Sequence, residues 1–194
     1  MTFFNKLVSD IPLLRDFIGR TEILKAPHRA DISFSALCAN ISLFQRKGDV
    51  DIKVLNSKTL WYTSDSLLLS LARACSLLLP PLPSLEHLGV YDFRPLPSRR
   101  QDEVQNTQWM ELLRPFITVK DLVLDELVVF PVASALQGLV GERVTEILPA
   151  LQNIFLVDFQ SSGQVPEGIA KFIAARELYG HPVSVSRQAR RQGP

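Results

Sequence analysis

The feature that most constrains the fold is an apolar frame that recurs at a nearly constant interval along the chain. Over residues 148–157 the frame reads Leu-x-x-Leu-x-x-Ile-x-Leu, and residues 82–90 and 116–124 repeat it with Leu, Phe or Val at the same places. Leu88, Leu122 and Ile154 are the equivalent positions, at intervals of 34 residues (88 to 122) and 32 residues (122 to 154). Such a period, with a helical pattern before each copy, indicates a stacked repeat.

Helix and strand patterns alternate along the chain around these frames. Apolar residues at helical spacing predict helices over 65–78, over about 107–116, from Pro131 to Gly141 and from Pro166 to Gly180, and a helical pattern broken at Pro12 over 3–18. Alternation of apolar and polar residues predicts strands over 30–34, 40–44, 50–55, 85–91, 119–125 and 183–186, and a further strand with Ile154 and Leu156 within the 148–157 frame. Asn106 or Thr107 is the expected cap of the second helix, and Pro131 the expected first turn of the third.

This order of elements predicts an α/β architecture. Strands joined by helical connections run parallel, and right-handed crossovers stack them side by side. The expected fold is therefore a leucine-rich-repeat-like solenoid, with parallel strands on one face and helices on the other, formed by a single domain over 1–187 and followed by a disordered tail over 188–194. One departure is that the asparagine that follows the strand in the usual repeat is absent, and Asn153 precedes Ile154 instead.

Composition excludes several classes of partner. The 194 residues carry 21 basic and 20 acidic side chains, well interspersed, for a net charge of +1. This balance predicts neither a nucleic-acid surface nor attachment to an anionic membrane. The longest apolar run, 77–82, is too short to span a bilayer. Cys38 and Cys75 lie far apart, outside any Cys-x-x-Cys spacing, which favours a reducing, intracellular compartment.

Residues that could perform chemistry are not grouped in any recognisable motif. His28, His87 and His181 stand far apart, at no metal-ligand spacing, and the sequence predicts neither a metal nor a cofactor. Asp121, Asp125 and Glu126 are expected to be solvated charges beside a strand. The sequence therefore predicts a non-enzymatic protein. The alternative, a hydrolase or transferase, requires a pocket where titratable groups converge.

Strand alternation separates the side chains of the core from those of a possible binding surface. Leu88, Leu122 and Ile154 point toward the helices. The opposite side of the strands forms the candidate partner-binding face, which comprises Lys53, Leu55, Tyr91, Val123, Asp125, Phe155 and Val157. Several of these are apolar, which is unusual for a purely solvated surface. A loop or terminal segment that covers them is the alternative explanation.

Several long motifs resemble one group of proteins. They are Asn106-Thr107-Gln108-Trp109, Leu112-Leu113-Arg114-Pro115-Phe116, the segment 148–156, and Gly180-His181-Pro182-Val183 followed by Val185-Ser186-Arg187. Together they resemble the C-terminal half of a large group of F-box proteins from mushroom-type (basidiomycete) fungi. The resemblance implies a scaffold that recruits a target protein, while an N-terminal F-box binds the Skp1 adaptor of a cullin-RING ubiquitin ligase.

The start of the chain departs from that pattern. No F-box-like helical segment precedes Phe3, so the chain is expected to be a short form that binds an unknown target protein, and a Skp1-type adaptor only if an upstream F-box exists. Its first strand is expected to lack an upstream neighbour, which predicts self-association at the N-terminal edge. The expected location is cytoplasmic or nuclear. A degraded paralogue without function is the remaining alternative.

Overall fold

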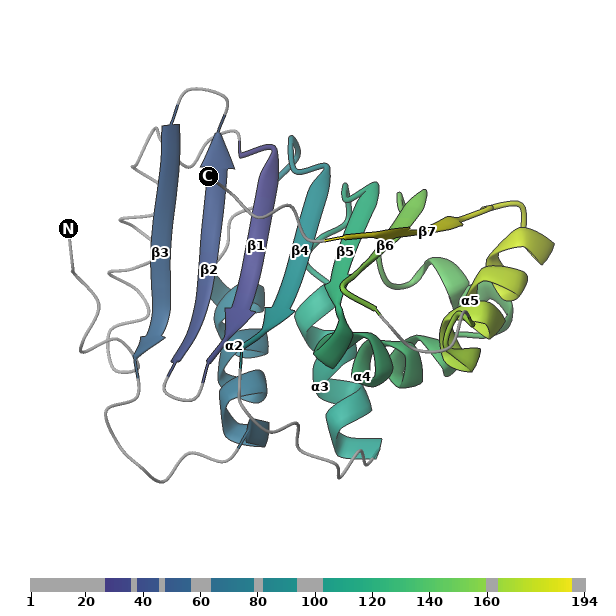
Figure 1. Cartoon of the computed structure of the whole chain (residues 1–194), viewed down its shortest axis with the longest axis horizontal. Helices are drawn as coiled ribbons and strands as arrows, with labels where there is room; N and C mark the ends of the chain where they lie inside the picture. Colours follow the sequence, from purple (N-terminus) through teal and green to yellow (C-terminus); the bar gives the residue numbers. More distant parts are fainter. Residues whose placement is uncertain are drawn as a thin grey trace.

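The protein forms one seven-stranded sheet with helices packed along it (Figure 1). The computed structural model describes residues 27–35, 38–45, 48–56, 64–78, 82–93, 103–159 and 164–189. The strands are β1 (Arg29–Phe34), β2 (Cys38–Gln45), β3 (Gly48–Asn56), β4 (His87–Asp92), β5 (Asp121–Asp125), β6 (Asn153–Val157) and β7 (Ser184–Gln188). The helices are α2 (Ser64–Leu78), α3 (Glu103–Leu113), α4 (Glu126–Gln137) and α5 (Glu167–Leu178), with a short 3₁₀ helix, η2 (Gly141–Thr145).

The strand register confirms that the apolar frames are equivalent. The strand order is β3-β2-β1-β4-β5-β6-β7, and every pair from β1–β4 to β6–β7 is parallel. Leu88 lies opposite Leu122, and Leu122 lies opposite Ile154. Ala30 and Val185 extend the same row at either end. The pairs β1–β2 and β2–β3 are antiparallel, so the first three strands form a meander instead of repeat units.

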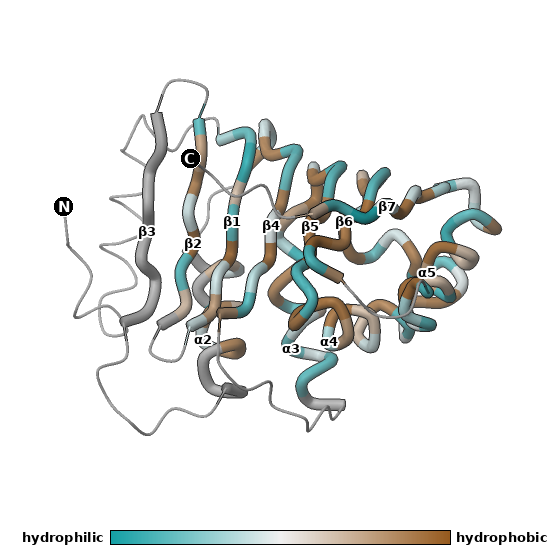
Figure 2. The backbone as a smooth tube through the Cα atoms, viewed as in Figure 1, coloured by the Kyte–Doolittle hydropathy of each residue, from teal (hydrophilic) through white to brown (hydrophobic). Residues whose placement is uncertain are grey.

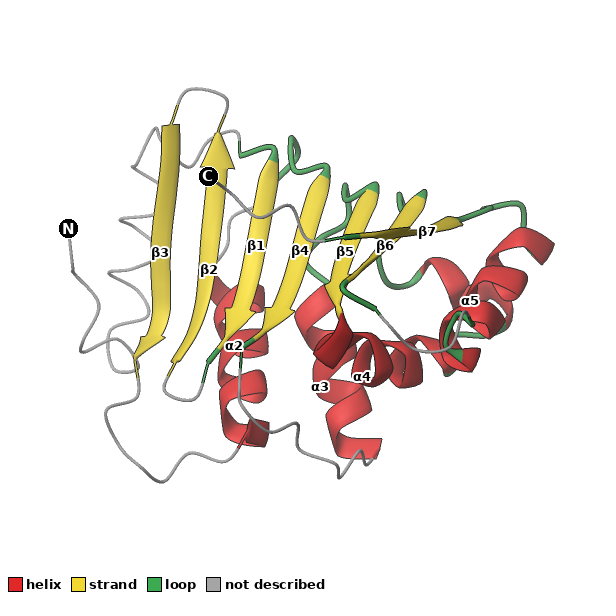
Figure 3. Cartoon of the chain, viewed as in Figure 1, coloured by secondary structure: helices red, strands yellow, loops and turns green. Residues whose placement is uncertain are grey.

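Helices cover one face of this sheet, as Figure 3 shows. Neighbouring helices pack in chain order, α2 on α3, α3 on α4 and α4 on α5. The strand residues that point toward them are fully buried, and Leu88, Leu122 and Ile154 are each 0% exposed. Hydrophobic segments recur along the parallel strands and in the helices beside them (Figure 2). The α/β class predicted from the sequence is therefore confirmed.

Two predicted helix starts are wrong. α3 begins at Glu103, so Asn106 and Thr107 lie inside the helix, and the buried side-chain oxygen of Asn106 has no hydrogen-bond partner in the described part of the chain. α4 begins at Glu126, and Pro131 lies in its interior. The reason is Asp125, whose carboxylate caps the helix directly at the end of β5. Gly141 does have the expected left-handed backbone (φ 63°), but it begins η2 after α4 has already ended.

The edges of the sheet also differ from expectation. β1 lies between β2 and β4, so the first described strand has neighbours on both sides, and the edge strands are β3 and β7. β7 extends to Gln188, one residue into the expected tail. The predicted helical pattern over 3–18 and the tail residues 190–194 lie outside the described residues.

A buried arginine holds the last unit together. Arg176 of α5 is 1% exposed, and its guanidinium donates to five backbone carbonyls, those of Val144, Leu148, Pro149, Leu151 and His181, at 3.0–3.3 Å. Four of these carbonyls belong to the segment between α4 and β6. That segment contains a strained residue, because Leu148 has a left-handed backbone with φ 50°. Arg176 thus fixes the turn that leads into β6, and burial lowers the pKa of its guanidinium.

We expect Arg176→Ala to destabilise the fold by about 3–5 kcal/mol, because it leaves several buried carbonyls without a donor. Urea denaturation measures the loss. Arg143→Ala is the matched control, since Arg143 forms an exposed ion pair with Glu146 and should change stability by less than about 1 kcal/mol. Equal effects of the two substitutions would contradict the structural role of Arg176.

Candidate interaction site

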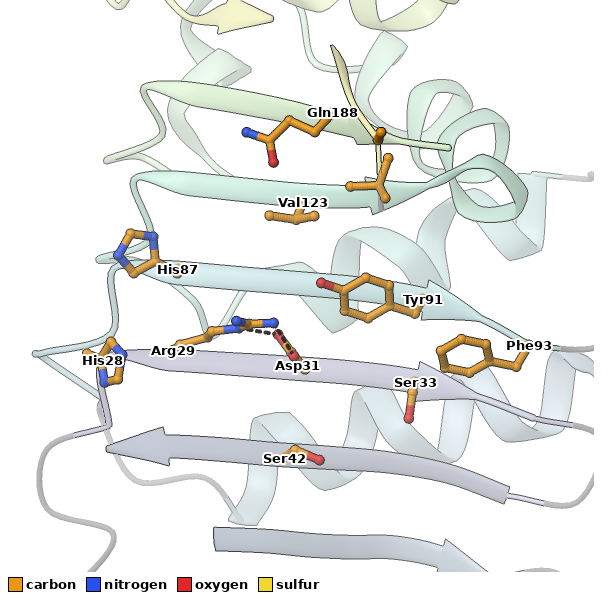
Figure 4. A pocket seen from close by; sticks show the side chains of 12 residues that line it. His28, Arg29, Asp31, Ser33, Ser42, His87, Tyr91, Phe93, Val123 and Gln188 are labelled. Atoms are coloured by element: carbon orange, nitrogen blue, oxygen red, sulfur yellow. Dashed lines mark hydrogen bonds and ion pairs between the residues drawn. The ribbon is translucent and has the colours of Figure 1, made fainter. Parts of the chain in front are cut away.

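The sheet face opposite the helices, here called the open face, contains a hollow of about 1110 Å³ (Figure 4). The hollow lies mainly over β1 and β4, with Val123 of β5 at its centre and Gln188 of β7 on the far side. Its lining combines charged, hydroxyl, aromatic and aliphatic groups: His28, Arg29, Asp31, Ser33, Ser42, His87, Tyr91, Phe93, Val123, Val157, Gln188 and Ala189. Such a mixed surface offers both apolar contact and hydrogen bonding to a partner.

A glycine allows the aromatic part of the hollow to form. A Cβ atom at Gly89 would lie 2.6 Å from Cε2 of Tyr91 and 2.6 Å from Oδ1 of Asp31, so the absence of a side chain leaves room for both groups over β4. The Tyr91 ring in turn stacks on Phe93, with centroids 6.3 Å apart and planes at 10°. Gly89 therefore determines where the ring of Tyr91 lies on the open face.

The charges beside Tyr91 neutralise each other. Arg29 donates from Nε to Oδ1 of Asp31 at 2.9 Å and from Nη2 to Oδ2 at 2.6 Å, a two-point contact between the guanidinium and the carboxylate. The hydrogen bond to Asp31 raises the pKa of Arg29 above its ordinary value. The guanidinium also lies over the ring of Phe44, 5.0 Å from its centroid. This part of the hollow is polar but nearly neutral.

A ladder of polar side chains crosses the open face where β4 to β7 begin. The four residues occupy equivalent register positions on adjacent strands. Ser184 donates to Oδ1 of Asn153 at 2.6 Å, Asn153 donates from Nδ2 to Asp121 at 2.7 Å, and Nδ1 of His87 lies 2.8 Å from Oδ2 of Asp121. The ladder ties four strands together and occupies Asn153, whose place in the sequence did not fit the usual repeat.

The structure brings most of the predicted face residues together. Tyr91, Val123 and Phe155 are half-buried and lie on the open face, with Val123 directly opposite Phe155. Val157 lines the hollow but is only 8% exposed. The backbones of Lys53 and Leu55 belong to β3, beyond β2 and β1, while their side chains lie outside the described part of the structure.

Asp125 does not contribute to this face as expected. It is 7% exposed; its Oδ1 accepts the N–H groups of Leu127 and Val128, each at 3.1 Å, and its Oδ2 accepts that of Asp92 at 2.8 Å. The prediction of a solvated charge is therefore wrong. Burial raises the pKa of the Asp125 carboxyl, and the backbone hydrogen bonds oppose this rise. The carboxylate caps α4 and joins β5 to β4.

Sequence reasoning missed the polar half of the hollow. Arg29, Asp31 and Ser33 follow the same alternation as the buried residues Ala30, Ile32 and Phe34. That pattern assigns them to the open face, but the repeat frame does not include the first strand. His87 could have been found from its register with Asp121 and Asn153, each of which stands one residue before the core position of its frame.

Several titratable side chains in or beside the hollow have polar partners on the sheet. Arg29 forms an ion pair with Asp31, and Nδ1 of His87 lies 2.8 Å from Oδ2 of Asp121. Within the described residues, no group of three or more His, Cys, Asp or Glu side chains is arranged to hold a metal ion. The same part of the chain contains no helix with the length and apolar character needed to cross a bilayer.

No protein-family model, curated protein or solved structure gives a significant match to this chain.

We expect Asp125→Ala to cost about 1–3 kcal/mol of stability, because α4 loses its cap and the N–H of Asp92 loses its acceptor. Asp125→Asn should cost less, since an amide oxygen still caps the helix. Thermal denaturation of both variants should give a lower melting temperature for Asp125→Ala than for Asp125→Asn. A wild-type melting curve for Asp125→Ala would show that the carboxylate has no structural role.

We expect Gly89→Ala to retain the fold while it displaces Tyr91. The atoms that a new methyl group meets are the ends of the Tyr91 and Asp31 side chains, which can rotate away. The cost should therefore stay below about 1.5 kcal/mol. Tyr91 ring resonances measured by NMR should shift, whereas those of Tyr179, at the end of α5, should not. Unchanged Tyr91 resonances would contradict the close packing of the ring over Gly89.

Proposed function

We propose that the chain is a non-enzymatic protein-interaction module that recruits a target protein through the open face of its sheet. The observation that carries this proposal is that, within the described residues, helices cover the sheet on one face only. The helices pack on one face, while the other carries a hollow and the half-buried side chains of Tyr91, Val123 and Phe155. A surface with apolar anchors inside a polar surround has the composition of a protein-binding site.

The proposed architecture is a short leucine-rich-repeat-like solenoid formed by the parallel part of the sheet. Three features support it: the intervals of 34 and 32 residues, the register that pairs their core positions, and the order in which α3, α4 and α5 pack. At one end of this array, the antiparallel meander of β1, β2 and β3 takes the place of further repeat units. Repeat arrays of this kind use their strand face for binding.

The proposed biological role is that of the repeat half of an F-box-type ubiquitin-ligase adaptor. Its support is the resemblance of the segments 106–116, 148–156 and 180–187 to the fungal proteins of that type. In this role the open face binds the protein to be ubiquitinated, and a Skp1-type adaptor binds through an F-box. The corresponding location is cytoplasmic or nuclear.

An enzymatic role has weaker support. The hollow does contain titratable side chains, but Arg29 is paired with Asp31 within β1, and Nδ1 of His87 lies 2.8 Å from Oδ2 of Asp121 on the neighbouring strand β5. Cys75 is buried, which raises the pKa of its thiol and disfavours a nucleophilic thiolate. Because these side chains already have partners, the hollow is better suited to binding a protein than to catalysis.

We expect Phe155→Glu to abolish target binding and to leave the protein folded. Phe155 is half-buried on the open face, so the substitution should cost no more than about 2 kcal/mol. Proteins captured from a lysate by the wild-type chain and retained through washing should be lost with Phe155→Glu. Circular dichroism monitors the fold, and Ile154→Glu, which buries a charge in the core, serves as the unfolded reference.

The matched control for binding is Val140→Glu, which places the same charge on an apolar residue that is 63% exposed and lies between α4 and η2, outside the sheet. It should capture the same proteins as the wild-type chain. Equal capture by Phe155→Glu and Val140→Glu would sink the proposal that the open face binds the target. The adaptor role has its own test, because the complete gene product should bind a recombinant Skp1-type protein.

A further inference from the structure

β7 ends the sheet with unpaired backbone groups along its outer side. Ser184 donates its N–H to the carbonyl of Gln152, and Gln188 accepts the N–H of Asp158, so residues 184, 186 and 188 form their hydrogen bonds toward β6. In a parallel pair the intervening residues point their N–H and C=O groups the other way. Val185 and Arg187 therefore present two donors and two acceptors away from the sheet, where the described part of the chain places no further strand.

This edge has little of the usual protection against pairing. Native edge strands commonly carry a proline, a bulge or charged side chains, above all lysine, and of these β7 has only the charge of Arg187. Ser184–Gln188 contains neither proline nor lysine, and its register with β6 is continuous. Four of its five residues are exposed, and Val185 is half-buried. Within the described part of the chain, the outer side of this strand is therefore open to another chain.

We propose that β7 pairs antiparallel with β7 of a second copy of this chain, about a two-fold axis at Ser186. A second copy fits this edge because the two outward-bonding residues of the strand can pair reciprocally. In this register Val185 faces Arg187 of the partner subunit, and Arg187 faces Val185 of the partner subunit, so both outward-bonding residues of each strand find a partner. The two Ser186 side chains meet at a position without hydrogen bonds, where strands approach most closely and small residues fit.

Neighbouring registers fit less well. A two-fold axis at Arg187 would place the two arginine charges directly opposite each other, which is destabilising. An axis at Val185 would pair Arg187 with Val183, which precedes the strand. The register at Ser186 avoids both problems and forms a closed, isologous contact.

The same symmetry keeps the last helix of both copies on one side of the paired strands. The two-fold axis is perpendicular to the sheet at β7, and α5 and β7 belong to the same end of the molecule (Figure 1), so α5 can approach its counterpart. On the outer surface of α5, Leu178 is 82% exposed, and Ala170 and Ala174 are small and exposed. Contact there adds apolar area to the small area that a five-residue strand buries alone.

Disulfide crosslinking tests the register. With Cys38 replaced by serine, Ser186→Cys should form a covalent dimer under mild oxidation, because the paired Cα atoms lie within disulfide range. Ser184→Cys is the matched control, since in this register its two copies are about 13 Å apart along the strands. Equal crosslinking of the two variants, or none with Ser186→Cys, would overturn the proposal.

Sedimentation velocity tests the pairing itself. The wild-type chain should shift from monomer to dimer across the micromolar range. Arg187→Pro should be monomeric because it removes an outward N–H, whereas Arg187→Ala keeps that N–H and should still dimerise. A wild-type chain that is monomeric throughout, or open-ended polymers through β7 and β3, would refute the inference. Melting curves verify that each variant folds, and target capture by the open face is a separate measurement.

Discussion

Right-handed crossover between in-register parallel strands is the constraint on which the rest of this structure depends. From β1 through β4, β5 and β6 to β7, each new parallel strand is added on the same side of the one before it. A right-handed crossover repeated in one direction places every connecting helix on the same face of the sheet. A sheet whose strand order reverses is covered on both faces. The open face is therefore a consequence of topology, before any side chain on it is considered.

Alternate residues of each strand then have different roles: one set packs in the core against the helices, and the other lies on the open face. This assignment fails at the ends of the strands. In mid-strand, Leu122 and Leu124 are fully buried against the helices, while Val123 remains half-buried on the open face. One residue later, Asp125 belongs by alternation to the open face, yet the chain has already turned into α4 and the carboxylate accepts three backbone N–H groups. The alternation of side chains along a strand assigns a residue to one face of the sheet reliably only where the strand continues beyond that residue.

The repeat frame also explains which parts of the fold could be predicted from the sequence. The repeat frame located β4, β5 and β6 and their register, because core positions must align when parallel strands share one apolar layer. The pairing of β1 with β4 could not be read in this way, since the meander that precedes it has no repeat frame. Arg176 was also missed. It stands four residues after Phe172 on the buried side of α5, where an arginine is unexpected unless distant carbonyls surround it.

Arg176 also explains how the array can end at α5. An inner helix such as α4 has an α-helix on each side, but within the described chain α5 has an α-helix on one side only, α4, and otherwise contacts the short helix η2. The missing side-to-side packing is offset by the five carbonyl contacts, which attach α5 to the turn before β6 and to His181 on the approach to β7. Because His181 is fixed in this way, β7 is held at its start by α5 as well as by β6. An edge strand anchored by hydrogen bonds at its start and along its inner side needs no cover on its outer side to remain ordered, and its outward N–H and C=O groups stay available for a second copy.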